Sequence, residues 1–408
     1  MVSTVVVALH PFAAGPRGVL LSPPCIHSRV GASIGRGGTV SADAGSVSSV
    51  NRVDLPGLTG EEPLGFLAAV GLMDQLMETS YLCWDRQDRH AILYCRRHSS
   101  VADLVDHLTG QLDRIEHGAA IPHTSGFPVR RRRGAPDPLR VRPADYRSLL
   151  ERVSRSSGGR HRLEATVTGR ATDEDGFCVV NPLVAVRGRQ TVGSFWYYPM
   201  RDVRQDPRRL LTEALTSWRR VDGSEGWLLD HHASYSTHPG LHGPGGSGAV
   251  PGATWLATLA VPTFGYRRRN GVKAGRPVLP NGWFRLGAED VFLWPLWTLP
   301  VSRDVLSSVW NVGWASDAWK LDRDRDGTLR ASIGTTHGVP APNSIDHAVD
   351  LDIFTMCAAV RRGTRGPLTP VPTATLRRAD ERSSYPAWAG WDRRYPDVGD
   401  YPGRYGWG

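Results

Sequence analysis

An apolar segment, residues 59–77, constrains the fold most strongly, because its hydrophobic side chains recur at the spacing of a helix. The segment opens with Thr59-Gly-Glu-Glu62, which matches a capping box at a helix N-terminus. Pro63 suits the first turn, where a backbone N–H has no helical partner. Gly65 and Gly71 lie inside the segment, although each glycine costs a helix about 1 kcal/mol relative to alanine. We therefore expect a buried helix that another part of the chain approaches closely at its glycines.

The residues after this segment predict a hairpin and a second helix. Two strand-like runs, 81–85 and 91–96, flank a polar turn. Ser100-Val-Ala-Asp103 then matches a helix start, and leucines follow on one stripe. Together with a basic loop at Arg130–Arg133, these elements form an expected N-terminal lobe, residues 51–160, in the order helix–hairpin–helix.

Residues 161–382 mix strand-like and helical patterns, and we expect them to form the main domain. Strands are predicted at residues 163–168, 177–186, 195–198, 255–262 and 353–360, and residues 291–299 form another apolar run. Amphipathic patterns predict helices at residues 144–153, 206–219 and 302–310. The chain is therefore expected to be an α+β protein with a mixed or antiparallel sheet and peripheral helices, in one lobe or two.

The two ends of the chain differ from the rest in composition. Residues 1–50 are rich in Gly, Ser, Ala and Val, and we expect a disordered leader, consistent with an over-extended gene start. Residues 383–408 are rich in Trp, Tyr, Gly and Arg and show no periodicity. We expect this tail to be disordered unless a partner orders it.

Arginine dominates the charged residues of the chain. The 49 basic residues outnumber the 40 acidic ones, and the formal net charge is +9. A GC-rich genome would explain the scarcity of lysine, but it would not explain the net charge. A basic chain favours acidic partners, and RNA or single-stranded DNA are the partners we expect.

Apolar runs and cysteine spacing indicate a cellular compartment. No run approaches the roughly 20 apolar residues of a membrane-spanning helix, so we expect no membrane partner. The five cysteines are odd in number, widely spaced and without a C-x-x-C pair. This pattern is typical of a reducing compartment without structural zinc, and it favours a cytoplasmic protein.

Two histidine-containing groups are candidates for metal chemistry. His231, His232 and His238 lie in a Pro- and Gly-rich stretch, and Asp346 and His347 could belong to a hydrolase site. Neither group has the helical H-E-x-x-H frame that fixes metal ligands, and the chain has no Walker A motif. We therefore expect no catalytic residue, metal or other cofactor, and a metal-dependent nuclease is an alternative.

Basic residues beside aromatic ones give the best candidates for nucleic-acid contact. Tyr266 precedes Arg267, Arg268 and Arg269, a combination that offers a ring for base stacking and guanidinium groups for phosphate. Arg131 and Arg132 belong to a second basic run. The alternative interpretation of both runs is a solvated basic loop that binds nothing.

Three motifs of this chain resemble a known family. They are GLTGEEPLGFLAAVGL at residues 57–72, PGATWLA at 251–257 and FLWPLW at 292–297. In type and order they are similar to motifs of CRISPR-associated proteins from type I-G (formerly I-U) loci.

The resemblance implies a non-catalytic subunit or accessory factor in antiviral defence. Its partners would be crRNA or target DNA and other CRISPR-associated subunits. The first motif is mostly apolar, so we expect it to act in packing or subunit contact, and it assigns no active-site residue to this chain. A structural scaffold without nucleic-acid contact is a further alternative.

Overall fold

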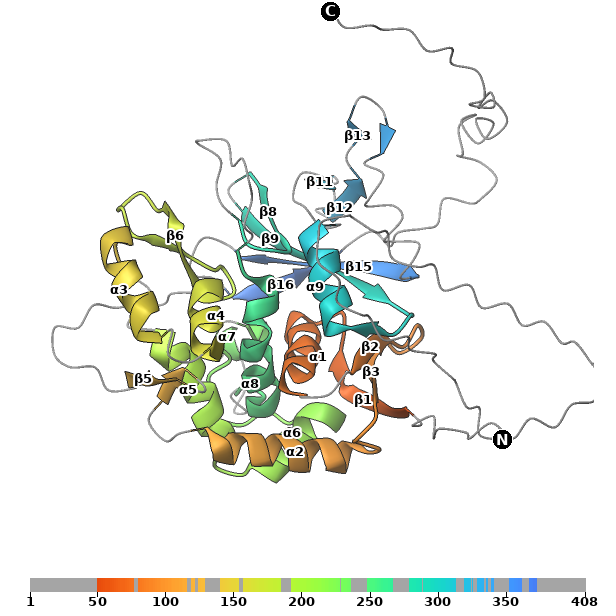
Figure 1. The fold of residues 1–408 in the computed structure, drawn as a ribbon. Coiled ribbons are helices and arrows are strands. Elements are labelled where there is room, and N and C mark those ends of the chain that lie inside the picture. Colours follow the sequence, from red (N-terminus) through yellow and green to blue (C-terminus); the bar gives the residue numbers. More distant parts are fainter. Residues whose placement is uncertain are drawn as a thin grey trace, which may run out of the picture.

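The structure is a computed structural model. It describes residues 50–372, with gaps at 77–79, 116–118, 122–123, 129–139, 154–156, 185–191, 228, 236–247, 267–278, 288, 313–318, 324, 326–328, 334, 337–338, 341–351 and 362–366. The described residues combine helices with antiparallel sheets, which confirms the predicted α+β class and selects the antiparallel form (Figure 1).

The first four-stranded sheet contains the predicted hairpin. Its strand order is β1 (Asn51–Thr59), β3 (His90–Cys95), β2 (Tyr81–Trp84) and β10 (Val301–Ser302). In the hairpin, Cys83 lies opposite Ile92, so Cys83 and Cys95 are not cross-strand neighbours. The four described cysteines are buried free thiols.

The second four-stranded sheet contains the FLWPLW motif. Its order is β16 (Leu368–Val371), β15 (Ile353–Arg361), β9 (Glu289–Trp297) and β8 (Trp283–Leu286). The predicted strand at 353–360 is confirmed as β15, and the apolar run at 291–299 lies mostly in β9. Two-stranded ribbons are formed by β4 (Ala119–Ile121) with β5 (Thr124–Pro128), β6 (Val167–Thr172) with β7 (Cys178–Val180), β11 (Trp319–Arg323) with β12 (Leu329–Ile333), and β13 (Thr335–Thr336) with β14 (Val339–Pro340).

Two helices occupy the interior, and the others surround them (Figure 1). The interior helices, α1 (Pro63–Gln75) and α8 (Pro251–Leu259), are apolar on all faces and almost entirely buried. The remaining helices are α2 (Val101–Arg114), α3 (Pro143–Val153), α4 (Ser157–Thr166), α5 (Val192–Val203), α6 (Pro207–Thr216), α7 (His231–Tyr235), α9 (Arg303–Val312) and the short 3-10 helix η2 (Val261–Phe264).

The predicted close approach at the glycines of α1 is confirmed. A Cβ added to Gly71 would lie 1.8 Å from the carbonyl oxygen of Leu256 in α8, and one added to Gly65 would lie 2.3 Å from that of Thr59. Gly252 of α8 has a similar role, because its Cβ would lie 2.5 Å from the Leu210 carbonyl oxygen. Only glycine allows these backbones to approach so closely.

Two of the three sequence motifs, those in α1 and β9, meet in one aromatic core. The ring of Phe66, in α1, stacks on Trp294 of β9 at 5.5 Å and on Trp84 of β2 at 5.7 Å. Trp297 of β9 donates its indole N–H to the Leu82 carbonyl at 2.8 Å and so joins the two large sheets. The core cluster spans Val53 to Leu368, so residues on both sides of the expected boundary at 160/161 pack together.

Several local predictions were wrong. Thr59 ends β1 instead of capping a helix, and Glu62 occupies the N-cap position without a side-chain capping bond. The predicted strands at 195–198 and 255–262 belong to helices α5 and α8, and most of 163–168 belongs to α4. Short apolar runs in a buried environment do not distinguish strand from helix by periodicity.

Other helix predictions were correct. Ser100 and Asp103 form the predicted capping box of α2, in which each side chain bonds to the other residue's backbone N–H. The helices expected at 144–153, 206–219 and 302–310 correspond to α3, α6 and α9. In the described part of the chain, no helix has the length and apolar character to cross a membrane.

Candidate functional site

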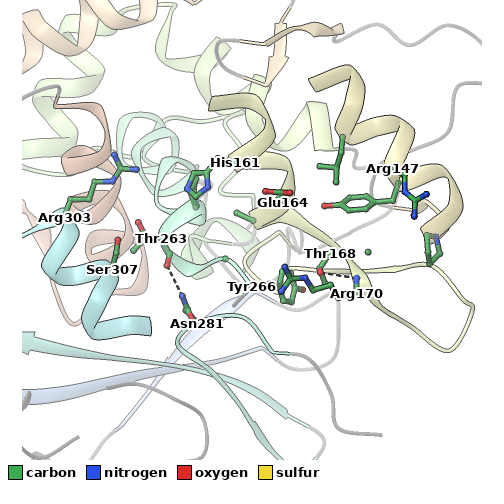
Figure 2. A pocket seen from close by; sticks show the side chains of 17 residues that line it. Arg147, His161, Glu164, Thr168, Arg170, Thr263, Tyr266, Asn281, Arg303 and Ser307 are labelled. Carbon is green, nitrogen blue, oxygen red and sulfur yellow. Dashed lines mark hydrogen bonds between the residues drawn. The ribbon is translucent and has the colours of Figure 1, made fainter. Parts of the chain in front are cut away.

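The described residues form a cavity of about 600 Å³ that is partly open to solvent (Figure 2). Its walls come from α3, α4, β6, η2 and α9, together with the chain just before β8. The lining residues are Pro143, Tyr146, Arg147, Leu150, His161, Glu164, Ala165, Thr168, Gly169, Arg170, Pro262, Thr263, Gly265, Tyr266, Asn281, Arg303 and Ser307.

The charged lining residues of this cavity are mainly basic. Arg147 extends from α3, Arg170 from β6 and Arg303 from the first turn of α9, and all three side chains are exposed (Figure 2). The carboxylate of Glu164 is the acidic group of the lining. The cavity therefore has an excess of positive charge, which attracts anions.

Arg303 also has a structural partner at the end of α1. Its Nη2 lies 2.5 Å from the Oδ1 of Asp74, and the buried Arg162 lies 3.7 Å from the same carboxylate. The Asp74 side chain is 8% exposed, so two arginines offset the charge of this buried carboxylate. Arg303 is consequently held in place at the cavity rim.

Polar groups line the inner wall of the cavity. The Tyr146 hydroxyl donates to the carbonyl of Val167 at 2.6 Å, and Gly169 leaves room for this ring, because its Cβ would lie 2.5 Å from it. The Tyr266 hydroxyl is fully buried and has no hydrogen-bond partner among the described residues. Burial raises the pKa of Tyr266 well above its usual value, so the hydroxyl stays protonated as a donor.

Of the residues predicted to contact nucleic acid, Tyr266 is described. It follows η2 directly, and its ring is half-buried in the cavity wall instead of being fully exposed on a loop. The other predicted contacts, Arg131, Arg132, Arg267, Arg268 and Arg269, lie outside the described residues. The same holds for His238, Asp346 and His347.

Two of the candidate metal ligands lie beside an unexpected third residue. The rings of His231 and His232 are 3.9 Å apart between centroids, and Glu62 Oε2 lies 3.7 Å from His231 Nδ1. One potential ligand atom from each of these residues lies within 4.8 Å of the other two. Burial lowers the pKa of His231 to about 4, with a further contribution from His232, and burial raises the pKa of Glu62.

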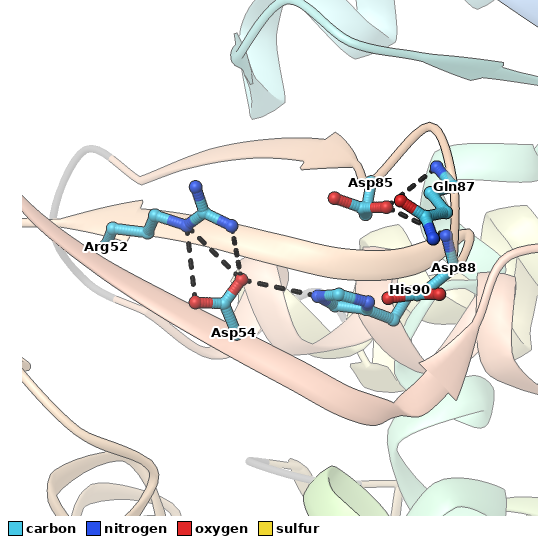
Figure 3. A network of polar contacts seen from close by, with 6 residues as sticks. All are labelled: Arg52, Asp54, Asp85, Gln87, Asp88 and His90. Carbon is cyan, nitrogen blue, oxygen red and sulfur yellow. Dashed lines mark hydrogen bonds and ion pairs between the residues drawn. The ribbon is translucent and has the colours of Figure 1, made fainter.

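A second polar cluster involves strands β1 and β3 of the first sheet and the turn between β2 and β3 (Figure 3). Arg52 Nη2 donates to Asp54 at 2.7 Å, which lowers the pKa of that carboxyl, and His90 lies 3.3 Å from the same carboxylate.

Asp85 accepts the backbone N–H groups of Gln87 and Asp88, both at 2.8 Å. Asp85, Asp88 and His90 could also surround an ion. The bonds in this cluster stabilise the β2–β3 turn, and they account for its geometry without a ligand.

Sequence reasoning missed the arginines of the cavity and the carboxylate of Glu62. Arg147, Arg170 and Arg303 are scattered in the sequence and belong to no basic run, so only the fold brings them together. The amphipathic pattern of 144–153 could have placed Arg147 on the exposed face of its helix. Comparison with known proteins gives no further guide, because no protein-family model and no curated protein matches this chain.

Proposed function

We propose that this protein binds RNA or single-stranded DNA as a non-catalytic subunit, and that the cavity beside Tyr266 receives part of the bound strand. The observation that carries the proposal is that Arg147, Arg170 and Arg303, from three separate elements, all line one cavity. Guanidinium groups bind phosphate oxygens through paired, charge-assisted hydrogen bonds. All three side chains are exposed and come from separate elements, so a phosphate could lie between two of them.

The size and the walls of the cavity support a single nucleotide unit as its occupant. Sites for small molecules commonly enclose about 300–1,000 Å³, and this cavity lies within that range. The half-buried ring of Tyr266 offers a surface for stacking, which contributes about 1–3 kcal/mol per base in single-strand binding. Asn281 and Thr168 add hydrogen-bonding groups to the same wall.

The sequence next to Tyr266 is basic. Tyr266 is followed directly in the chain by Arg267, Arg268 and Arg269, which lie outside the described residues and add three positive charges to this part of the sequence. The resemblance of three motifs to type I-G CRISPR-associated proteins favours the same class of ligand. In this proposal the protein acts in the cytoplasm with other CRISPR-associated subunits, and catalysis belongs to those neighbours.

A binding titration with a short single-stranded RNA tests the proposal. We expect the double variant Arg147→Ala/Arg170→Ala to bind at least tenfold more weakly than the unmodified chain at 100 mM salt. Both side chains are exposed, so the variant should fold. A parallel titration with single-stranded DNA of the same sequence identifies the preferred strand.

The matched control is Arg114→Ala/Arg209→Ala, which removes the same charge from α2 and α6, away from the cavity lining. It should bind nearly as well as the unmodified chain. Equal loss in both variants would indicate a general charge effect and contradict a role for the cavity. The absence of any binding at low salt would leave the structural scaffold as the function.

A further inference from the structure

We infer that Glu62, His231 and His232 form a binding site for one divalent transition-metal ion, with zinc as the best fit. The inference is independent of the proposed nucleic-acid binding, because none of these residues lines the cavity. It rests on the positions of the three side chains, on the chemistry of their donor atoms and on the bonds that hold the turn before α7.

The distances are close to those of a bound ion. The three ligand atoms lie within 4.8 Å of one another. In a tetrahedral site with bonds of 2.0–2.2 Å, ligand atoms are separated by about 3.4 Å. The separation between Glu62 Oε2 and His231 Nδ1, at 3.7 Å, is already near this value. Small rotations of the side chains would complete the geometry.

Hydrogen bonding does not explain why Glu62 faces His231. A separation of 3.7 Å is too long for a hydrogen bond between them. Glu62 stands at the N-cap of α1, where a carboxylate commonly bonds to the first backbone N–H groups, yet its side chain makes no such bond. The Glu62 carboxylate therefore faces His231 and makes no capping hydrogen bond to the first turn of α1.

The donor set selects the kind of ion. Two imidazole nitrogens and one carboxylate oxygen suit Zn²⁺ and its first-row neighbours. Calcium and magnesium prefer oxygen ligands alone. Three protein ligands leave a fourth position for water, and the exposed side of His232 makes that position accessible.

The turn that carries the histidines is held rigidly. Asp230 is 1% exposed, accepts the backbone N–H of His232 at 3.1 Å and pairs with Arg220 at 2.6 Å. Gly226 accepts the backbone N–H groups of Leu229 and Asp230 at 2.9 and 3.2 Å. Metal ligands need such outer support, because it fixes their orientation before the ion binds.

The experiment uses the full chain without a histidine tag, stripped with EDTA and titrated with Zn²⁺ by calorimetry. We expect one ion per chain with micromolar or tighter affinity. Replacing Zn²⁺ by Co²⁺ gives a second reading, because a cobalt ion bound by nitrogen and oxygen ligands absorbs visible light.

Three variants and one control decide the outcome. Glu62→Gln, His231→Gln and His232→Gln should each weaken zinc binding at least tenfold and change the cobalt spectrum. His107→Gln removes an imidazole from α2, outside both groups of possible ligands, and should leave both unchanged. Glu62→Gln preserves side-chain size, so it decides the matter if a histidine variant does not fold. Absence of saturable binding, or binding that all three variants retain, would overturn the inference.

Discussion

The indole Nε1 of Trp294 donates a hydrogen bond of 2.8 Å to the carbonyl oxygen of Gly60, and both residues are buried. This bond connects the centre of β9 with the turn that precedes α1, and so it joins two of the three sequence motifs, FLWPLW and GLTGEEPLGFLAAVGL. The remaining motif, PGATWLA in α8, packs against the first one where the backbone of Leu256 approaches Gly71. In this structure the motifs act in packing, as the apolar character of the first one suggests.

Removing the Trp294 hydrogen bond should destabilise the protein. In Trp294→Phe the Gly60 carbonyl would stay buried without its donor, which costs about 1–3 kcal/mol in addition to the lost volume. Chemical denaturation followed by fluorescence or circular dichroism measures the free energy of unfolding. The matched control is Trp255→Phe, because the indole N–H of Trp255 is buried without a partner among the described residues. A larger loss in the Trp255 variant would contradict this account.

Alanine at two helical glycines should have opposite effects. In Gly71→Ala the new methyl group would meet the Leu256 carbonyl at 1.8 Å, so α1 and α8 would have to separate, and we expect a loss of about 1–3 kcal/mol in the free energy of unfolding. Gly110 in α2 has nothing within 4 Å of its Cβ position. Gly110→Ala should therefore stabilise the protein by about 0.5–1 kcal/mol. Thermal unfolding of the two variants compares them, and equal effects would refute the close contact.

Sequence patterns predicted the outline of the fold through elements with strong local signals. The α2 capping box, the β2–β3 hairpin and the amphipathic α6 each have a residue pattern that only one structure satisfies well. The interior helix α8 was predicted as a strand, because a continuous apolar run has no polar face to reveal its period.

The candidate sites were less accessible to sequence reasoning. Glu62 was assigned to a capping box, although tertiary structure places its carboxylate beside His231. The cavity depends on arginines from three separate elements, and spacing along the chain gives no sign that they converge. Tyr266 was predicted as a contact residue from its basic neighbours, and the structure adds the cavity that it lines.

The metal-free protein should lose stability as the pH falls from about 6.5 to 4 because of His231. Burial lowers the pKa of His231 to about 4, with smaller lowering contributions from His232 and Arg220, and Asp230 opposes this shift. Over this range the unfolded chain binds a proton that the folded chain does not, so the free energy of unfolding falls by up to about 3 kcal/mol. Urea denaturation in EDTA across this range measures the loss.

The variant His231→Gln lacks the titrating group, so its stability should fall less over the same pH range. Comparison of the two proteins removes the contribution of carboxylates that titrate in both. Parallel pH dependence of the two proteins would show that His231 has an ordinary pKa in the folded chain.

The most direct test of the central claim is the salt dependence of RNA binding by the unmodified chain and by Arg147→Ala/Arg170→Ala. Each lost phosphate contact on a single strand reduces the slope of log affinity against log salt by about 0.7. If both arginines bind phosphate, the slope of the double variant should be smaller by about 1.4, while that of Arg114→Ala/Arg209→Ala stays unchanged. An unchanged slope in the cavity variant would contradict phosphate binding by Arg147 and Arg170, and with it the proposed role of the cavity.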